Sequence, residues 1–342
     1  MELMSRPETV PDQEARIEFL RQPQVYPEKP GRIETIETHM SWVFLTPQHA
    51  FKLKKPVRYD YLDFSTVAAR KTNCEEELRL NQRLAPDVYL DVVPLVLDGD
   101  GEMRLGGQGE IIDWLVMMRR LPAERMLDYL IRKRALEPMD THAVAEVLAR
   151  FYRESTPIGI GGAEYRRQYQ HKVRMNHDTL ADPAYGLPTA LVEAVYQVQR
   201  QFLMRAPQLL EHRATDGRVI EGHGDLRPEH VCVKSLPVIF DRLEFNRAFR
   251  IIDPADELAY LAMECERLGA PQVEPELLGA YRRFTGDYPP PRLIWFYKAH
   301  RACLRARLAI WHLRDLERNS WPRWRVTAEE YLHLAESYGG KF

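Results

Sequence analysis

The sequence has little cysteine, with four residues among 342 and no C-x-x-C pair. The four thiols lie far apart in the chain, so neither a structural zinc site nor a disulfide framework explains them. We expect them to be small, buried, apolar side chains. They are Cys74, Cys232, Cys265 and Cys303.

Charge of one sign and long apolar runs are also missing. The 48 basic residues nearly balance the 50 acidic ones, and the formal net charge is -2. Nucleic acids and anionic membranes attract broad basic surfaces, so this balance predicts neither partner. No apolar run approaches the roughly 18 residues that indicate a membrane span. The first residues, MELMSRPETVPDQEARIEF, carry acids where a secretory signal has an apolar core, which predicts a cytoplasmic protein.

What is present is an ordinary globular composition, 45% hydrophobic and 29% charged. A chain of 342 residues is long enough for about two domains, each with its own core.

One polar segment, HGDLRPEH at residues 223–230, stands out because sixteen residues after Asp225 a short apolar run ends in Asp241. Short strand-like runs flank this loop, at 218–220, 231–233 and 238–240, and we expect them to bring Asp225, His230 and Asp241 near one another. An acceptor-facing carboxylate, a metal-binding carboxylate and a third polar ligand are the parts of a phosphoryl-transfer site. Such sites work by positioning and charge stabilisation.

The same segment resembles the protein-kinase catalytic loop H-R-D-x-x-x-x-N. It resembles more closely the loop of aminoglycoside phosphotransferases, which reads roughly H-G-D-L-H-P-x-N. The positions that match are His223, Gly224, Asp225, Leu226 and Pro228. The position that departs is His230, where the family has Asn. Asn offers Mg²⁺ an oxygen ligand, whereas imidazole suits transition metals better.

This resemblance implies an α+β protein-kinase-like fold, with a small β-rich N-terminal lobe and a larger, mainly helical C-terminal lobe. It further implies ATP and Mg²⁺ as cofactors and the hydroxyl of a small molecule as acceptor. Asp225 would orient that hydroxyl and accept its proton, and Asp241 would bind Mg²⁺. His230 would complete the metal shell directly or through a water, and His223 would be a buried brace for the loop.

Residues 33–54 read as three strands, at 33–38, 42–45 and 50–54. No G-x-G-x-x-G is present, so the nucleotide-covering turn would be built around residues 38–41. Along 50–54, Lys52 and Lys54 share one face of the strand, and Phe51 and Leu53 share the other. The resemblance implies that Lys52 contacts the α and β phosphates, with Lys54 as the alternative. Both lysines being solvated strand charges is the competing interpretation.

Residues 66–85 carry good helix formers and end before Pro86. In the kinase-like fold this helix offers a glutamate to the strand lysine, and Glu77 has the matching spacing. A half-buried lysine needs such a partner to hold its charge and orientation. Glu75 and Glu76 would then be the solvated members of the three consecutive glutamates.

Two further strand-like segments, 89–97 and 111–118, are separated by a glycine-rich hairpin. The second resembles the strand that leads into the hinge between the lobes, where an adenine would pair with backbone groups from Met117 to Arg119. We therefore predict an N-terminal nucleotide-covering lobe at 1–118 and a C-terminal lobe with the catalytic loop at 119–342.

The C-terminal part is predicted to be helical. Residues 251–259, IIDPADELA, resemble the D-x-x-D-L-A segment of the same family, and we interpret Asp256 as a structural residue near a helix N-terminus. Thr327 to Glu330 form a capping box, which predicts the start of a last helix that closes at Gly339 and Gly340. The other predicted helices cover 143–152, 164–176, 189–211 and 293–316.

Two alternative functions remain open at this point. A nucleotide-binding regulator of the same fold would tolerate His230 in place of Asn. A metal-dependent phosphohydrolase would ligate a transition metal and activate water, but it leaves Lys52 and Glu77 unexplained. Its ligands would be His223, Asp225, His230 and Asp241.

Overall fold

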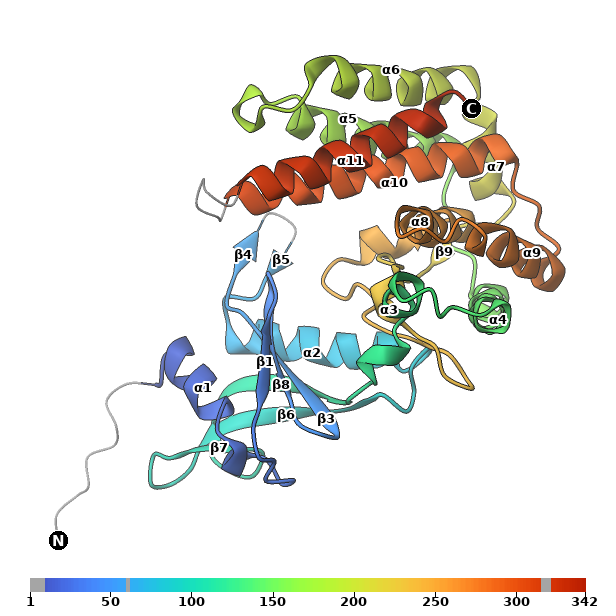
Figure 1. The fold of residues 1–342 in the computed structure, drawn as a ribbon. Coiled ribbons are helices and arrows are strands. Elements are labelled where there is room, and N and C mark those ends of the chain that lie inside the picture. Colours follow the sequence, from blue (N-terminus) through green and yellow to red (C-terminus); the bar gives the residue numbers. More distant parts are fainter. Residues whose placement is uncertain (1–9, 60–61, 315–320) are drawn as a thin grey trace, which may run out of the picture. The chain divides into compact units, whose positions relative to one another are not determined.

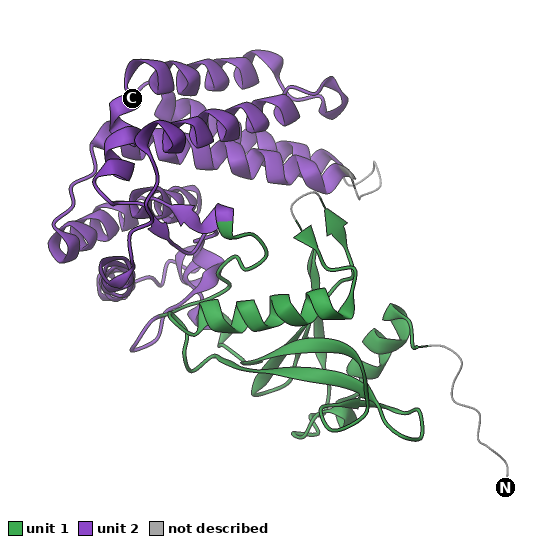
Figure 2. Cartoon of the chain, turned by 180° about the vertical axis from the view of Figure 1, so that it is seen from behind, with its two compact units in different colours: residues 1–123, 238–247 green, residues 124–237, 248–342 purple. Residues whose placement is uncertain are grey.

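The computed structural model describes residues 10–59, 62–314 and 321–342. The chain forms two compact units, which Figure 2 shows in two colours. Unit 1 comprises Met1–Ala123 and Val238–Arg247, and unit 2 comprises Glu124–Pro237 and Ala248–Phe342. The segment that contains Asp241 therefore folds with the N-terminal unit, although it follows the loop at 223–230 in sequence.

Unit 1 is built on a six-stranded antiparallel sheet with the strand order β1-β2-β3-β8-β6-β7 (Figure 1). In a strand, successive side chains point to opposite faces of the sheet. Alternating apolar residues therefore favour these strands, because all the apolar side chains of one set can be buried on the same face. The sheet strands are β1 Glu34–Glu37, β2 Ser41–Leu45, β3 His49–Lys54, β6 Tyr89–Leu97, β7 Met103–Leu105 and β8 Glu110–Arg119. The remaining elements are α1 Gln13–Leu20, α2 Val67–Asn81, and the short antiparallel pair β4 Arg58–Tyr59 and β5 Leu62–Asp63. Strand β11 Val238–Ile239 belongs to the returning segment.

The two faces of β3 enter different apolar cores. Phe51 and Leu53 pack in a cluster that includes Ile17 of α1. Ala50 packs on the other side, in a cluster with Cys74 of α2. The alternation predicted for residues 50–54 is confirmed, because the lysines share the face that meets α2.

Helix α2 is capped and anchored by its sequence. Thr66 is its N-cap, and its hydroxyl accepts a hydrogen bond from the N–H of Ala69 at 3.1 Å. Arg70, buried in the helix, pairs with the carboxylate of Asp113 on β8 at 2.7 and 3.0 Å. Asp113 also accepts from Arg16 of α1 at 2.8 Å. One buried carboxylate thus ties both helices to the sheet and sets where α2 presents its glutamates.

Unit 2 is mainly helical. Figure 1 shows α5, α6, α10 and α11 running alongside one another, with α8, α9 and α4 beside them. Two short strands, β9 Ile220–Glu221 and β12 Ile251–Ile252, pair antiparallel. A third, β10 Val231–Cys232, directly follows the loop at 223–230. The helices are α3 Leu127–Arg132, α4 Pro138–Glu154, α5 Gly162–Leu180, α6 Thr189–Arg205, α7 Pro207–Thr215, α8 Pro254–Arg267, α9 Val273–Thr285, α10 Pro291–Trp311 and α11 Trp321–Gly339.

Several predicted helix boundaries were wrong. The helix predicted at 189–211 is interrupted at Ala206, because the next residue, Pro207, has no N–H to continue the ladder. The last helix begins at Trp321, well before the capping box predicted at Thr327. The Thr327 hydroxyl instead bonds back to the Arg323 carbonyl inside the helix. The end predicted at 316 lies outside the described residues.

Helix α8 begins at a buried carboxylate. Asp253 is its N-cap and accepts from the N–H of Ala255 at 2.9 Å. The same carboxylate pairs with Arg213 at 2.7 and 2.8 Å and accepts from the Tyr297 hydroxyl at 2.9 Å. Asp256, in the first turn, pairs with Arg301 at 2.7 and 3.1 Å. The interpretation of Asp256 as structural is confirmed by this buried pair.

The predicted fold class, a β-rich part followed by a larger helical part, is confirmed. All four cysteines are free and buried, as expected. Among the helices that the structure describes, none is long and apolar enough to cross a bilayer.

Candidate functional site

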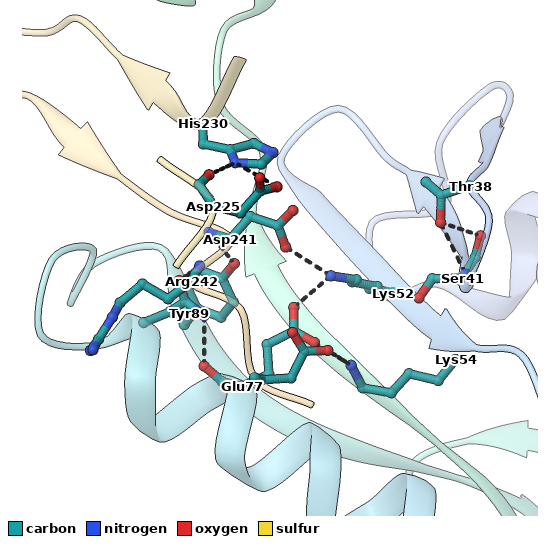
Figure 3. Close-up of polar contacts among 12 residues, drawn as sticks. Thr38, Ser41, Lys52, Lys54, Glu77, Tyr89, Asp225, His230, Asp241 and Arg242 are labelled. Atoms are coloured by element: carbon teal, nitrogen blue, oxygen red, sulfur yellow. Dashed lines mark hydrogen bonds and ion pairs between the residues drawn. The ribbon is translucent and has the colours of Figure 1, made fainter. Parts of the chain in front are cut away.

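Lys52 reaches two carboxylates of unit 1. Its ammonium lies 2.8 Å from Glu77 Oε1 and 3.0 Å from Asp241 Oδ1 (Figure 3). Burial opposes the positive charge, but the surrounding Asp241 and Glu77 raise the pKa of Lys52 well above its usual value. The side chain is 16% exposed. Lys52 is therefore a permanently charged ammonium that keeps some access to solvent.

Lys54, two residues along the same strand, is enclosed. It donates to Glu77 Oε2 at 2.6 Å and to Glu244 Oε1 at 2.5 Å, and its side chain is 1% exposed. Both neighbouring carboxylates keep the ammonium charged despite its burial. Because Lys54 has no exposed surface, Lys52 is the better placed of the two lysines to meet a ligand.

Glu77 is the glutamate that α2 offers to the lysines. Its side chain is fully buried, and one carboxylate oxygen faces each lysine (Figure 3). Burial would raise the pKa of Glu77, but Lys52 and Lys54 lower it, so the carboxylate stays ionised. Its neighbours bond elsewhere on α2, Glu76 to Arg79 and Glu75 to Lys71. Of the three consecutive glutamates, Glu77 is thus the one that contacts both lysines, and its part in a nucleotide site stays a prediction.

Asp241 adopts a backbone conformation that is uncommon for a residue with a side chain, with φ of 60°. Its N–H donates to the hydroxyl of buried Tyr89 at 3.1 Å. The next N–H, of Arg242, donates to Asn81 Oδ1 at the end of α2, at 2.9 Å. These two bonds hold the turn, and 38% of the Asp241 side chain remains exposed. Strained residues of this kind cluster at ligand sites.

The turn expected to cover a nucleotide joins β1 and β2. The Thr38 hydroxyl accepts from the Ser41 N–H at 3.0 Å, and the Thr38 N–H donates to the Ser41 carbonyl at 2.8 Å (Figure 3). A side-chain bond closes this turn where a glycine-rich sequence would otherwise be needed.

The catalytic-loop carboxylate, Asp225 of unit 2, is held at both oxygens. The hydroxyl of Tyr260 on α8 donates to Oδ1 at 3.1 Å, and Arg227 Nε donates to Oδ2 at 3.0 Å. Burial opposes ionisation, but Arg227 and His230 lower the pKa of Asp225 well below its usual range. Asp225 is therefore ionised at neutral pH and fixed in direction.

The two histidines of the loop brace it. His223 is fully buried, and its Nδ1 accepts from the Asp225 N–H at 3.3 Å, which confirms the predicted brace. His230 Nδ1 lies 2.8 Å from the Asp225 carbonyl oxygen, and Arg227 Nη2 lies 3.2 Å from His230 Nε2 (Figure 3 shows His230 beside Asp225). Each ring nitrogen of His230 is thus engaged in a hydrogen bond. Metal ligation by His230 stays a prediction, and it would require Nε2 to exchange Arg227 for the metal.

The two hinge residues lie in the sheet. Met117 is paired within β8 with residues of both β3 and β6. Arg119 is the last residue of β8, and its N–H donates to the Val88 carbonyl at 2.8 Å. Adenine pairing at Met117 and Arg119 stays a prediction. Of the two, Arg119 lies at the end of the strand, where the ladder stops.

The structure thus brings the predicted residues together in two groups. Lys52, Glu77 and Asp241 meet in unit 1, and Asp225 and His230 meet in unit 2. Across the residues that the structure describes, no three His, Cys, Asp or Glu side chains are grouped as a metal cage.

Sequence reasoning missed several contributors to these groups. Glu244, three residues after Asp241, is the second partner of Lys54. Tyr260 and Arg227 both bond Asp225. Arg227 carried a signal, because it stands where the family loop has His, but a tyrosine thirty-five residues after the aspartate carried none.

No protein-family model matches the chain. The uncharacterized protein Rv2004c of Mycobacterium tuberculosis is 32% identical over 283 residues, covering 81% of this chain and 54% of that protein. An uncharacterized protein of Mycobacterium bovis matches to the same extent. The chain spans about half the length of the curated relatives it matches.

Solved structures match over nearly the whole chain. An aminoglycoside 2'-phosphotransferase in complex with GDP has a TM-score of 0.55 at 14% identity, covering 94% of this chain and 97% of that one. The choline kinase of Cryptosporidium parvum has a TM-score of 0.52 at 9% identity, covering 96% and 94%. A choline/ethanolamine kinase family protein of Mesorhizobium loti has a TM-score of 0.51 at 15% identity, covering 94% and 99%.

The chain has the protein-kinase-like fold. Within that kinase-like fold, the aminoglycoside phosphotransferases and the choline kinases are the structures it resembles. The resemblance inferred from the loop at 223–230 is confirmed at the level of the fold.

Proposed function

We propose that this protein transfers the γ-phosphate of ATP, with Mg²⁺, to a hydroxyl group of a small molecule. The observation that carries the proposal is the contact of Lys52 with both Glu77 and Asp241. A kinase-like fold uses a lysine held by a helix glutamate, together with a metal-binding aspartate, to position nucleotide phosphates. The resemblance in fold to small-molecule phosphotransferases supports the acceptor class.

Lys52 is assigned to the α and β phosphates. The ammonium is held by the buried Glu77, so little conformational freedom is lost when an anion binds. Asp241 Oδ1 also contacts this ammonium, at 3.0 Å. We expect a bound phosphate to share or replace that contact, which frees the aspartate for a cation.

Asp241 fits the chemistry of a magnesium ligand. Its carboxylate is a hard oxygen donor, the type Mg²⁺ prefers, and 38% of the side chain is open to solvent and to water ligands. Mg²⁺ sites of this kind use one or two protein carboxylates and complete the shell with water and phosphate oxygens. When bound, the ion neutralises charge between the β and γ phosphates.

Asp225 is assigned to the acceptor. Its lowered pKa makes it a weak base, so its main role is to accept a hydrogen bond from the acceptor hydroxyl and aim it at the phosphate. The hydroxyl proton passes to Asp225 only as the new O–P bond forms and the bond between the γ-phosphorus and the bridging oxygen breaks, which releases ADP. Arg227 and Tyr260 fix the carboxylate so that this direction is set before the acceptor arrives.

A second candidate is a nucleotide-binding regulator with weak turnover. The observation that favours it is the engagement of both Asp225 oxygens and both His230 nitrogens in hydrogen bonds within the loop. Such a protein would bind ATP through Lys52 and Asp241 but transfer phosphate poorly.

The test of nucleotide binding is thermal unfolding with and without ATP and Mg²⁺. A ligand at about 100 times its dissociation constant stabilises the folded protein by about 2.7 kcal/mol. We expect this shift in the wild type and a smaller one in Lys52→Met and Asp241→Ala. The control is Lys71→Met, which removes an exposed lysine of α2 and should leave the shift unchanged. An equal shift in Lys52→Met and the wild type would contradict the assignment.

The test of transfer uses Asp225→Asn. This variant should keep the nucleotide-induced shift and lose roughly 10²- to 10⁴-fold in the rate of ADP formation with an acceptor. Loss of nucleotide binding in Asp225→Asn would count against the acceptor role. The regulator would be favoured if the wild type and Asp225→Asn consume ATP at the same slow rate with every acceptor in a panel. The nucleotide-induced thermal shift would be intact in both proteins.

A further inference from the structure

Two arginines of unit 2 share a single buried carboxylate. Arg305 of α10 places Nε 2.9 Å from Glu264 Oε1, and Arg267 of α8 places Nε 3.1 Å from Oε2. The Tyr331 hydroxyl of α11 donates to the same carboxylate, at 2.8 and 2.9 Å. The Glu264 side chain is only 3% exposed. Side chains of α8, α10 and α11 therefore meet at one buried carboxylate, which pairs with two arginines.

Within the described part of the chain, the hydrogen bonds of both guanidiniums are made through Nε, and the terminal nitrogens donate no hydrogen bond. The side chains of Arg305 and Arg267 are 22% and 31% exposed, so these nitrogens can be reached from solvent. A guanidinium with free terminal N–H groups matches the oxygens of a carboxylate or phosphate.

The arginine pair is also rigid. Their guanidinium carbons lie 4.9 Å (Arg267) and 5.6 Å (Arg305) from the centre of the Tyr331 ring, which places both cations against one aromatic side chain. Arg227 pairs with Asp225 and Glu229, and Lys298 pairs with Glu266. Among the described residues, Glu264 is thus the carboxylate that both Arg267 and Arg305 contact.

The arginine pair lies beside the carboxylate assigned to the acceptor. Tyr260, which donates to Asp225, and Glu264, which holds the arginines, are four residues apart on α8 and so lie on the same face, one turn from each other. Arg305 also contributes to the low pKa of Asp225, which places it within electrostatic reach of that carboxylate. An acceptor of sugar size spans a distance on the order of one helical turn, about 5 Å.

We propose that Arg267 and Arg305 bind an anionic group of the acceptor, so that the substrate is a small hydroxyl compound bearing a carboxylate or a phosphate. This inference rests on the proposed function and names its acceptor class. An ammonium group offers no acceptor to the N–H donors of Arg267 and Arg305, so a polycationic amino sugar is disfavoured.

The binding test uses two anions and no turnover. The affinity of the protein for inorganic phosphate and for malonate is measured by isothermal titration in the wild type, Arg305→Gln and Arg267→Gln. We expect each variant to bind about 10- to 100-fold more weakly, the loss typical of a hydrogen bond to a charged group. The tighter of the two anions in the wild type identifies the phosphate or carboxylate class. Unchanged affinity in both variants would overturn the inference.

Matched variants separate binding from folding. Arg305→Lys retains the charge and should recover part of the lost affinity, which a purely structural defect would not. Arg200→Gln removes an exposed arginine of α6 and should leave anion binding unchanged. Circular dichroism on each variant verifies that the helical unit is intact.

A turnover test then compares acceptors on one sugar skeleton. They are a neutral hexose, the uronic acid and the monophosphate derived from it, and the corresponding amino sugar. We expect an anionic member to have the lowest KM, and Arg305→Gln to raise that KM while the ATP-induced thermal shift stays intact. Preference for the amino sugar would overturn the inference and leave the proposed function standing. Absence of the ATP-induced shift in the wild type would overturn the proposed function instead, and the anion titration would still decide whether the arginines form a site.

Discussion

Lys52 and Lys54 lie on the same strand and contact the same glutamate, but they differ in exposure. Lys52 keeps 16% of its side chain exposed, whereas Lys54 keeps 1%. A buried ion pair contributes little net stability compared with an apolar replacement, but removal of one partner leaves an uncompensated charge. Lys54 therefore serves to hold Glu77 in place, and Lys52 is the cation left for a ligand.

His300 of α10 gives a prediction about pH. Its ring is 4% exposed and its Nδ1 has no partner among the described residues. Burial, with repulsion from Arg301 and Lys172, lowers the pKa of His300 to about 3, although Asp256 opposes this. Below about pH 6.5 the unfolded chain therefore binds a proton that the folded chain does not, and stability falls as pH decreases from 6.5 toward 3.

The measurement is the free energy of unfolding in urea at several pH values for the wild type and His300→Gln. Carboxylates titrate in the same range in both proteins, so the difference between the curves isolates the histidine. The difference should change by up to about 1.4 kcal/mol per pH unit in that window and be flat above it. Parallel curves throughout would show that His300 takes up a proton in the folded protein.

At the element scale, α8 links the core of unit 2 to its chemistry. It begins at Asp253, whose carboxylate caps the helix and pairs with the buried Arg213. It then presents Tyr260 to Asp225 and, one turn later, Glu264 to the two arginines. The position of both groups depends on where this helix starts.

We predict that Asp253→Ala lowers the free energy of unfolding by about 3–5 kcal/mol, because Arg213 is left partly unpaired in a buried place. The comparison is Asp182→Ala, which removes the exposed cap of a short 3₁₀ helix at Pro183–Tyr185 and should cost about 1 kcal/mol. Chemical denaturation of both variants measures the two losses. Equal losses would mean that Asp253 acts only as a helix cap.

At the scale of the whole molecule, unit 1 is completed by a segment from far along the chain. Val238 and Phe240 pack against the α2 side of the sheet. Arg242 is buried and donates to the Leu80 carbonyl at 2.8 Å, and Glu244 pairs with Lys54. The unit thus owes part of its core and one of its buried ion pairs to residues 238–247.

A fragment of residues 10–123 should therefore fold poorly by itself. Without Glu244, Lys54 loses one of its two buried partners, a change that costs on the order of 3–5 kcal/mol. The same fragment with residues 238–247 joined by a flexible linker should show stronger far-ultraviolet circular dichroism and well-dispersed amide resonances. A linker carrying the same ten residues in scrambled order is the control. Equal folding of all three fragments would contradict the prediction.

The sequence by itself determined features that are encoded over a few neighbouring residues. The alternation of residues 50–54 set both faces of β3. The loop at 223–230 indicated the fold through its resemblance to the aminoglycoside phosphotransferase loop, and the same resemblance pointed to Glu77. Helix ends were less predictable. The capping box at Thr327 is a local signal for the start of a helix. Helix α11 begins earlier, at Trp321, because its packing against α10 stabilises the additional residues.

Only the tertiary structure decided which side chains from distant segments meet. Nothing near Lys54 in sequence shows that Glu244 will enclose it, or that Asp241 joins unit 1. Likewise, Glu264 gathers Arg267 from its own helix and Arg305 from another. The physical reason is that helices and strands are favoured by local periodicity and capping, whereas burial and pairing depend on how separate elements pack. The chemistry proposed for this protein lies in those long-range pairs.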